Sequence, residues 1–220
     1  MSDYRLYYSP GACSLAPHIA LEELGIAYEA MPVPVAQGAN QKPDYLAINP
    51  RGRVPALVIR DVDGERVLTE VPALLVYLAG LKPEARLLPA SGEPLARAIE
   101  WMSWLTSSVH AHAFAQVFRP GRFVSDESLH APLKARGLEL LDLAYRDIEQ
   151  RLQGRDWALG ADYSLVDAYL LVFYRWGYRV GVDMRARYPG YTRLVEAVVA
   201  RPAVRRALQQ EQIVVWESSQ

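Results

Sequence analysis

The sequence predicts a fold of the α/β plus all-α class, with an α/β unit followed by an all-helical unit. Strand patterns, a Pro-Gly turn and a hairpin signal all lie before residue 70. Residues 83–94 are rich in proline and glycine, and beyond them the strand patterns stop and helical spacing takes over. We therefore expect an N-terminal domain of residues 1–82, a linker of residues 83–94 and a helical domain of residues 95–220.

Length and composition fit a globular protein with a substantial core. The chain has 220 residues, of which 51% are hydrophobic, and 24 Lys and Arg residues nearly cancel 25 Asp and Glu residues. Such a balance gives no field that would draw the chain to nucleic acid or to a membrane, so neither partner is expected. A single cysteine excludes a disulfide framework. Without a signal peptide or a membrane-spanning run, the expected location is cytoplasmic.

The first elements form a strand–helix–strand series. Residues 4–8 alternate weakly and predict a strand, and residues 14–24 predict a helix that ends at Gly25. Residues 26–35 have strand character with prolines, which suits the edge of a sheet. Residues 36–42 are polar and are expected to form a loop.

Cys13 is the most informative single residue, because it falls at the start of the first helix after a Pro-Gly turn. Free N–H groups and the helix dipole stabilise an anion at such a position. We therefore expect a lowered thiol pKa and a functional sulfur. The alternative is a small apolar filler in a tight turn. Ala16 stands where a dithiol protein has its second cysteine, so any partner thiol must come from another molecule.

A second loop lies ahead of a strand that begins at Pro55. A short helical turn from Asp44 leads into this loop, which contains Asn49-Pro50 and Val54-Pro55. A proline at a strand start is compatible with either a cis or a trans peptide bond, and the spacing does not decide between them. A cis bond would free the N–H and C=O groups of Val54 to pair with an extended ligand.

Residues 56–69 predict a β-hairpin with its turn at Asp63-Gly64, and a helix opens directly after it. Pro72 suits the first turn of that helix. The N–H of Val71 could hold a carboxylate at the helix N-terminus, and the neighbouring Glu70 could hold an ammonium group. The pair matches the zwitterionic end of an amino acid.

Helical patterns fill residues 95–118, 128–153, 164–177, 191–199 and 202–210. In the first of these helices the expected buried stripe is Leu95, Ile99, Met102, Leu105, Thr106, Val109 and Ala113. Beside it, at helical spacing, Ser103, Ser107, His110 and Phe114 could line a cleft between the domains. The alternative is a boundary histidine satisfied by a neighbour. Ser164 and Asp167 form a capping box with a structural role.

Four segments carry a resemblance to a known family. They are residues 7–18 (Tyr-Tyr-Ser-Pro-Gly-Ala-Cys-Ser-Leu-Ala-Pro-His), 46–55, 68–70 and 166–169, in this order. They make the chain similar to cytosolic glutathione transferases, most of all to the bacterial beta class, over nearly its whole length. The resemblance implies a thioredoxin-like N-terminal domain, a helical-bundle C-terminal domain, a cis peptide bond before Pro55 and a twofold homodimer.

The resemblance also implies a site for glutathione as substrate, with no metal. Cys13 and His110 are the implied catalytic residues, and Cys13 could hold the glutathione sulfur as a mixed disulfide. The implied glutathione-binding residues are Tyr8, Ser14, Arg53, Val54, Pro55, Glu70, Val71 and Ser107. The implied electrophile pocket consists of Ala12, Ser103, Phe114 and Trp176, although Trp176 could also be an apolar core residue.

The sequence departs from the beta-class pattern at two lysines. The loop after the second strand reads Val-Ala-Gln-Gly at residues 35–38, and Ala111 follows the cleft histidine. In addition, Ser103 replaces a usual asparagine. The loss of two cations should weaken binding of an anionic tripeptide unless arginines such as Arg51 or Arg53 compensate.

The expected function is conjugation of glutathione to small electrophiles in detoxification. Thiol transfer or peroxidase activity through the Cys13 mixed disulfide is a further expected activity. Two other functions stay open: a catalytically weak binding or regulatory protein of the same fold, and a glutathione-dependent isomerase or dehalogenase.

Overall fold

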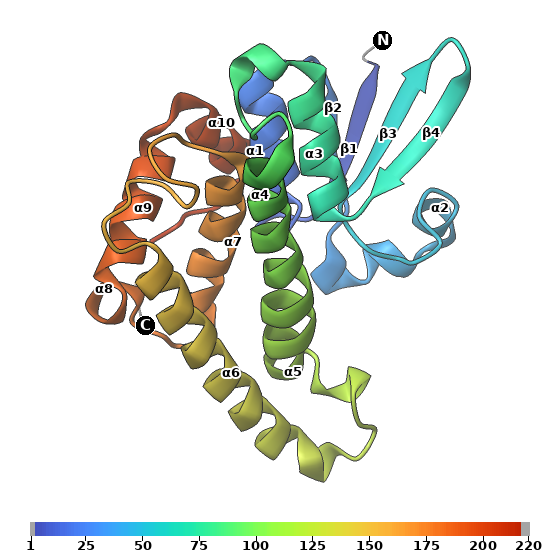
Figure 1. The fold of residues 1–220 in the computed structure, drawn as a ribbon. Helices are drawn as coiled ribbons and strands as arrows, with labels where there is room; N and C mark the ends of the chain where they lie inside the picture. Colours follow the sequence, from blue (N-terminus) through green and yellow to red (C-terminus); the bar gives the residue numbers. More distant parts are fainter. Residues whose placement is uncertain (1–2, 217–220) are drawn as a thin grey trace.

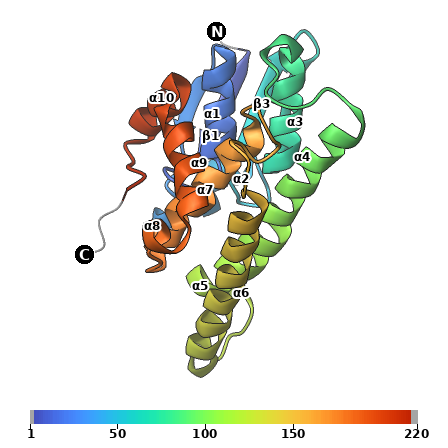
Figure 2. The same cartoon turned by 60° about the vertical axis from the view of Figure 1, so that its left-hand side comes forward.

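The computed structural model describes residues 3–216 and shows a small sheet beside a group of long helices (Figures 1 and 2). Residues 1–2 and 217–220, the outer ends of the two expected domains, lie outside the described residues. The architecture confirms the expected fold class, because all strands belong to the N-terminal half and the C-terminal half is helical.

The sheet has four strands in the order β2-β1-β3-β4. They are β1 (Tyr4–Tyr8), β2 (Glu29–Pro32), β3 (Ala56–Asp61) and β4 (Gly64–Thr69). β1 runs parallel to β2 and antiparallel to β3, and β3 and β4 form the predicted hairpin. β2 lies at an edge of the sheet, as its prolines predict.

Three helices accompany the sheet: α1 (Leu15–Leu24), α2 (Pro43–Leu46) and α3 (Val71–Leu81). Gly25, with φ 58°, ends α1 as predicted. The segment expected to be a loop instead contains two 3₁₀ turns, Val35–Gln37 and Ala39–Gln41. A 3₁₀ turn pairs backbone groups within a few residues, which a polar composition does not reveal.

The helical half contains more elements than the sequence patterns predicted. Its elements are α4 (Gly92–Trp104), a π-helical segment (Leu105–Phe114), α5 (Ala115–Phe118), α6 (His130–Arg151), α7 (Leu165–Arg179), α8 (Met184–Arg187), α9 (Pro189–Ala200) and α10 (Pro202–Glu211). Short 3₁₀ turns occur at Pro83–Ala85, Pro120–Arg122 and Glu127–Leu129. The sequence patterns predicted neither α8 nor these turns, since each is only three or four residues long.

The proline-rich stretch between the halves is packed rather than open. Leu87 and Leu88 are buried, and the Leu87 carbonyl accepts a hydrogen bond of 2.9 Å from the Leu165 N–H. α4 begins at Gly92, which lies inside the expected linker. Ile99 was expected in the buried stripe of this helix, but 39% of it is exposed.

α7 is the centre of the helical half, since every residue from Leu165 to Gly177 is buried. The predicted capping box is present: Asp167 Oδ2 accepts the Ser164 N–H at 2.7 Å. Its other oxygen accepts the Ala158 N–H at 2.8 Å, and burial raises the pKa of Asp167 to about 6. Within residues 3–216, no helix is both long and apolar enough to cross a bilayer.

Candidate functional site

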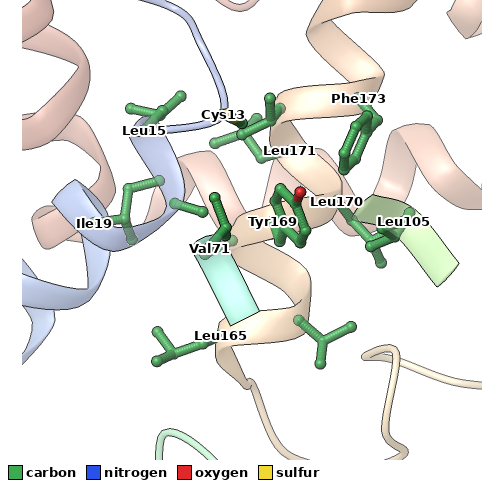
Figure 3. Packing of buried hydrophobic residues seen from close by; sticks show 14 of the residues in the cluster. Cys13, Leu15, Ile19, Val71, Leu105, Leu165, Tyr169, Leu170, Leu171 and Phe173 are labelled. Atoms are coloured by element: carbon green, nitrogen blue, oxygen red, sulfur yellow. The ribbon is translucent and has the colours of Figure 1, made fainter. Parts of the chain in front are cut away.

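Cys13 lies in the turn that precedes α1, and it is covered by the helical half. Figure 3 shows it within the buried apolar cluster, together with Tyr169 and Leu171 of α7. The residue is 7% exposed, and burial raises the pKa of its thiol to about 12. The expectation of a lowered pKa is therefore wrong. The reason is that removing the thiolate from water costs more than the N–H groups at the helix start return.

The sulfur nevertheless lies beside the predicted prolyl loop. The Cys13 Sγ donates a hydrogen bond to the Val54 carbonyl oxygen at 3.6 Å. The Val54–Pro55 peptide bond is cis, which confirms the form implied by the resemblance. The loop is fixed from behind, because Tyr45 and Asn49 donate hydrogen bonds of 2.6 and 2.7 Å to the Arg53 carbonyl.

Glu70 and Val71 are placed as the sequence predicts, at the N-terminus of α3. Val71 is the first residue of this helix, where backbone N–H groups have no carbonyl one turn earlier. Glu70 adopts a left-handed φ of 71°, which side chains adopt only at a cost. Within residues 3–216, the exposed Glu70 carboxylate has no ion-pair partner. Its charge acts on the Cys13 thiol, so the two groups belong to one site.

The Gly11 peptide, two residues before the cysteine, is clamped by the helical half. Its N–H donates to Glu211 Oε2 at 2.7 Å, and its carbonyl accepts the Trp176 Nε1–H at 2.8 Å. Gly11 has φ +66°, and a Cβ there would overlap the buried guanidinium group of Arg175. Only glycine fits this position. The sulfur loop, residues 9–14, is thus held by α7 and by the last residue of α10.

Tyr8 and Ser14 belong to the packing behind this loop and not to an open site. Ser14 is fully buried, and its hydroxyl exchanges hydrogen bonds with the backbone of Ser9. The Tyr8 ring packs 5.1 Å from the ring of His18, whose Nδ1 lies 2.8 Å from Glu211 Oε1. The expectation that both residues face glutathione is therefore not met in this structure.

Residues 105–114, on the helical side of the site, are π-helical, with i→i+5 backbone bonds. The predicted buried stripe is nevertheless confirmed at Leu105, Val109 and Ala113, which are all buried. Ser103 and Ser107 are exposed as expected, and the Ser107 hydroxyl donates to the Ser103 carbonyl at 2.9 Å. Phe114, however, is 0% exposed and packs in the core, so it does not line an open pocket.

His110 is half-buried and packs edge-to-face against Trp176, with 4.9 Å between the centres of the two rings. Burial, together with the charges of Arg119, Arg53 and Arg122, lowers the pKa of His110 to about 4. The imidazole is therefore neutral at physiological pH. It can accept or donate a hydrogen bond, but it carries no charge to offer an anion.

Trp176 joins the two halves of the molecule. It is buried, its indole N–H binds the Gly11 carbonyl, and its ring lies 5.8 Å from that of Phe118. Trp176 is thus a core residue, as one interpretation of the sequence predicts, and it also contacts the sulfur loop. Ala12, the next residue of that loop, is half-buried.

The two lysines of the beta-class pattern are absent, but several arginines lie near the site. Arg51 donates to the Thr69 hydroxyl at 3.2 Å, and the charge of Arg53 reaches His110. Arg119 and Arg122, which follow α5, also act on His110. Arg119, Arg122 and Glu211 could not be predicted from the sequence. No local pattern indicates that the turn after α5 or the last helix lies near the sulfur loop.

Neither a metal-binding cluster nor a large surface groove is found at this site among the described residues. Over the described part of the chain, no three His, Cys, Asp or Glu side chains are grouped so that they could hold a metal ion. Surface grooves of about 680 Å³, beside Trp101 and Arg155, and about 290 Å³, beside Trp104 and Leu143, contain none of the site residues.

Comparison with known proteins agrees with this geometry. The glutathione S-transferase N-terminal domain profile matches residues 11–81, and the C-terminal domain profile matches residues 112–202. The chain is 31% identical over 209 residues to glutathione S-transferase GstA of Escherichia coli O157:H7, covering 94% of this chain and 98% of the relative. It is also 31% identical over 209 residues to maleylacetoacetate isomerase of Pseudomonas aeruginosa, covering 92% and 94%.

Solved structures are similar over almost the whole chain. A glutathione transferase homologue from Sulfitobacter, with bound glutathione, has a TM-score of 0.89 at 36% identity and covers 97% of this chain and 100% of its own. A beta-class glutathione S-transferase from Sphingomonas chungbukensis has a TM-score of 0.81 at 38% identity, with coverage of 96% and 100%. The sequence, the fold and these similarities place the chain in the glutathione S-transferase family.

Proposed function

We propose that this protein binds glutathione beside Cys13 and conjugates it to small electrophiles. The observation that carries the proposal is the juxtaposition of three separate segments at the sulfur. The Cys13 Sγ is 3.6 Å from the Val54 carbonyl oxygen, and the charge of Glu70 acts on the same thiol. Similarity to a Sulfitobacter homologue with bound glutathione supports the choice of ligand.

Each end of the tripeptide has a matching group. The γ-glutamyl ammonium would pair with the exposed Glu70 carboxylate, and the neighbouring carboxylate would accept the N–H groups that open α3. The cysteinyl backbone would pair with Val54 at the start of β3, in the manner of an added strand. Bound in this way, glutathione would have its sulfur near Cys13.

In the conjugation step, the glutathione sulfur forms a bond to the electrophilic carbon. The leaving group departs with its electron pair, and the thiol proton passes to solvent. The nucleophile is a thiolate. Because burial raises the pKa of Cys13 to about 12, Cys13 keeps its proton and can donate a hydrogen bond to the glutathione sulfur. Thiol transfer through a Cys13 mixed disulfide is disfavoured by the same high pKa.

A glutathione-dependent isomerase is the second candidate function. It is favoured by similarity to the maleylacetoacetate isomerase of Pseudomonas aeruginosa over 92% of this chain. A binding or regulatory role without turnover is the third candidate. Measuring the rate of turnover distinguishes it from the transferase and the isomerase.

We further propose a cytoplasmic homodimer with the domain division 1–82, 83–94 and 95–220. An exposed apolar surface supports the dimer: Leu143 of α6 is 59% exposed and borders the groove of about 290 Å³ beside Trp104. Such a surface is typical of an interface. Sedimentation velocity should show a dimer that Leu143→Arg converts to monomer. A wild-type monomer at micromolar concentration would contradict the dimer.

The enzymatic proposal is tested by conjugation of glutathione to a neutral aryl chloride. The reaction rate is measured from the release of chloride. The wild type should turn over. Glu70→Gln should raise the KM for glutathione by about tenfold, because it removes one charge pair. Glu196→Gln, on the exposed face of α9, is the matched control. Glutathione binding without turnover in the wild type would favour the regulatory alternative.

A further inference from the structure

Three arginines from two distant segments lie near enough to His110 for their charges to lower its pKa. Arg53 precedes Val54 in the prolyl loop, and Arg119 and Arg122 bracket the 3₁₀ turn that follows α5. All the charges that act on the His110 imidazole belong to these three residues, and all are positive. We call Arg53, Arg119 and Arg122 the arginine rim.

The guanidinium groups of the rim have no ion-pair partner in the described part of the chain. All three residues are exposed. By contrast, their backbones are fixed: the Arg53 carbonyl accepts the Tyr45 hydroxyl, and the Arg122 N–H donates to the Arg119 carbonyl at 3.0 Å. Partial burial lowers the pKa of Arg122, and the positive charges of Arg119 and Arg53 also lower it. Like charges held together in this way form a preorganised anion site.

An exposed aromatic surface adjoins the rim. Phe118, directly before Arg119, is 39% exposed although its ring packs 5.8 Å from the buried Trp176. The Arg179 Cζ lies 5.5 Å from the centre of the Phe118 ring, which adds a fourth positive charge. Trp176 in turn holds the Gly11 carbonyl of the sulfur loop. The partly exposed Phe118 ring is thus linked through Trp176 to the sulfur loop and lies against the guanidinium group of Arg179.

We propose that the second substrate is a planar or aromatic organic anion, whose carboxylate is bound by Arg119 and Arg122 while its apolar body packs on Phe118. This inference rests on the proposed function, because it names the class of electrophile that the same site accepts. A guanidinium recognises a carboxylate through paired N–H groups, and an aromatic ring offers the adjoining apolar body a stacking face.

The competing use of the rim is binding of the glycyl carboxylate of glutathione itself. The two uses predict different results, since one concerns the electrophile and the other the tripeptide. Arg122 is the cleaner residue for the test, because Arg119 also acts on the Cys13 thiol.

The experiment compares two chlorides that differ only in charge: 4-chloro-3-nitrobenzoate and 4-chloro-3-nitrobenzamide. With each, glutathione forms a carbon–sulfur bond, chloride leaves with the electron pair, and the thiol proton goes to solvent. Each kcat/KM is divided by the uncatalysed rate constant at the same pH. The benzoate should be favoured by the wild type, and this preference should fall about tenfold in the Arg119→Gln/Arg122→Gln double variant and less in Arg122→Gln alone.

The control variant is Arg193→Gln, since Arg193 is an exposed arginine on α9, away from the rim. It should leave the preference unchanged. A wild type that favours the benzamide, or a preference that survives the double variant, would overturn the inference. A weakened calorimetric affinity for glutathione in the double variant with unchanged preference would assign the rim to the tripeptide instead.

Binding of unreactive probes separates this inference from the proposed function. 3-Nitrobenzoate and 3-nitrobenzamide lack the leaving group, and their affinities can be measured by NMR titration. Selective binding of the benzoate, lost in the double variant, with no turnover of either chloride would sink the proposed function and keep the anion site. Turnover of the benzamide without selective benzoate binding would do the reverse.

Discussion

The sulfur loop and the arginine rim face the same site but are built in opposite ways. In the loop, the Cys13 thiol is 7% exposed, and the Gly11 peptide has a partner at both its N–H and its carbonyl. In the rim, the guanidinium groups of Arg53, Arg119 and Arg122 are exposed and unpaired within the described residues. The first region is rigid and desolvated, and the second is charged and open.

The difference teaches that the lone cysteine is not the reactive group that its position at a helix start suggests. Desolvation dominates where α7 covers the loop, so the thiol stays neutral. The net positive charge of the site lies instead on the far side, where water remains. Under our proposals, the loop positions the glutathione sulfur and the rim selects the electrophile.

The largest effect is expected from breaking the clamp on the loop. Glu211→Ala would leave the Gly11 N–H and the His18 ring without their buried partner. We expect a loss of about 3 kcal/mol in the free energy of unfolding, measured by urea denaturation. Glu196→Ala removes an exposed ion pair with Arg185 and should cost less than about 1 kcal/mol. Equal losses in the two variants would show that the clamp does not hold the loop.

Slow alkylation of Cys13 would support the contrast between the buried sulfur loop and the exposed arginine rim. With a pKa of about 12, this thiol has little thiolate at neutral pH. Its alkylation by iodoacetamide at pH 7, followed by intact mass, should be at least about 50-fold slower than in the urea-unfolded chain. Cys13→Ala is the blank, because the chain has no other cysteine. Alkylation at the unfolded rate would mean that the sulfur is open and activated.

A smaller effect concerns pH. The folded pKa of His110, about 4, lies below the ordinary value of about 6.5. The imidazole ¹H shift of His110 should therefore stay constant between pH 5.5 and 8. The stability linked to this residue is complete above about pH 6.5 and is lost as the pH falls toward 4. His110→Asn should remove that part of the acid sensitivity. A midpoint near pH 6.5 in the NMR titration would contradict both the burial of His110 beside Trp176 and the effect of the rim charges on it.

Much of the fold followed from local patterns. The hairpin of β3 and β4, the start of α3 after Glu70 and the Ser164–Asp167 capping box each depend on a few neighbouring residues. The prolyl loop and the opening motif placed Cys13, Val54 and Glu70 together because the resemblance supplied the topology. These predictions needed no knowledge of how the two halves pack.

The rest of the site depends on contacts between distant segments. The bond from Gly11 to Glu211 spans 200 positions, and nothing around Glu211 marks it as a buried acceptor. The burial of Cys13 comes from α7, so its pKa could not be read from the helix start alone. Phe114 is fully buried because it packs against Phe173 and Trp176 of α7, a contact that its spacing within its own helix does not show.

The most direct measurement is a calorimetric titration of the wild type with glutathione and with its analogue that lacks the γ-glutamyl amino group. Glutathione should saturate one site per chain, and the analogue should bind about tenfold more weakly because it cannot pair with Glu70. Glu70→Gln should bring the two affinities together. No saturable heat with glutathione, or equal affinities in the wild type, would contradict a glutathione site at the sulfur loop.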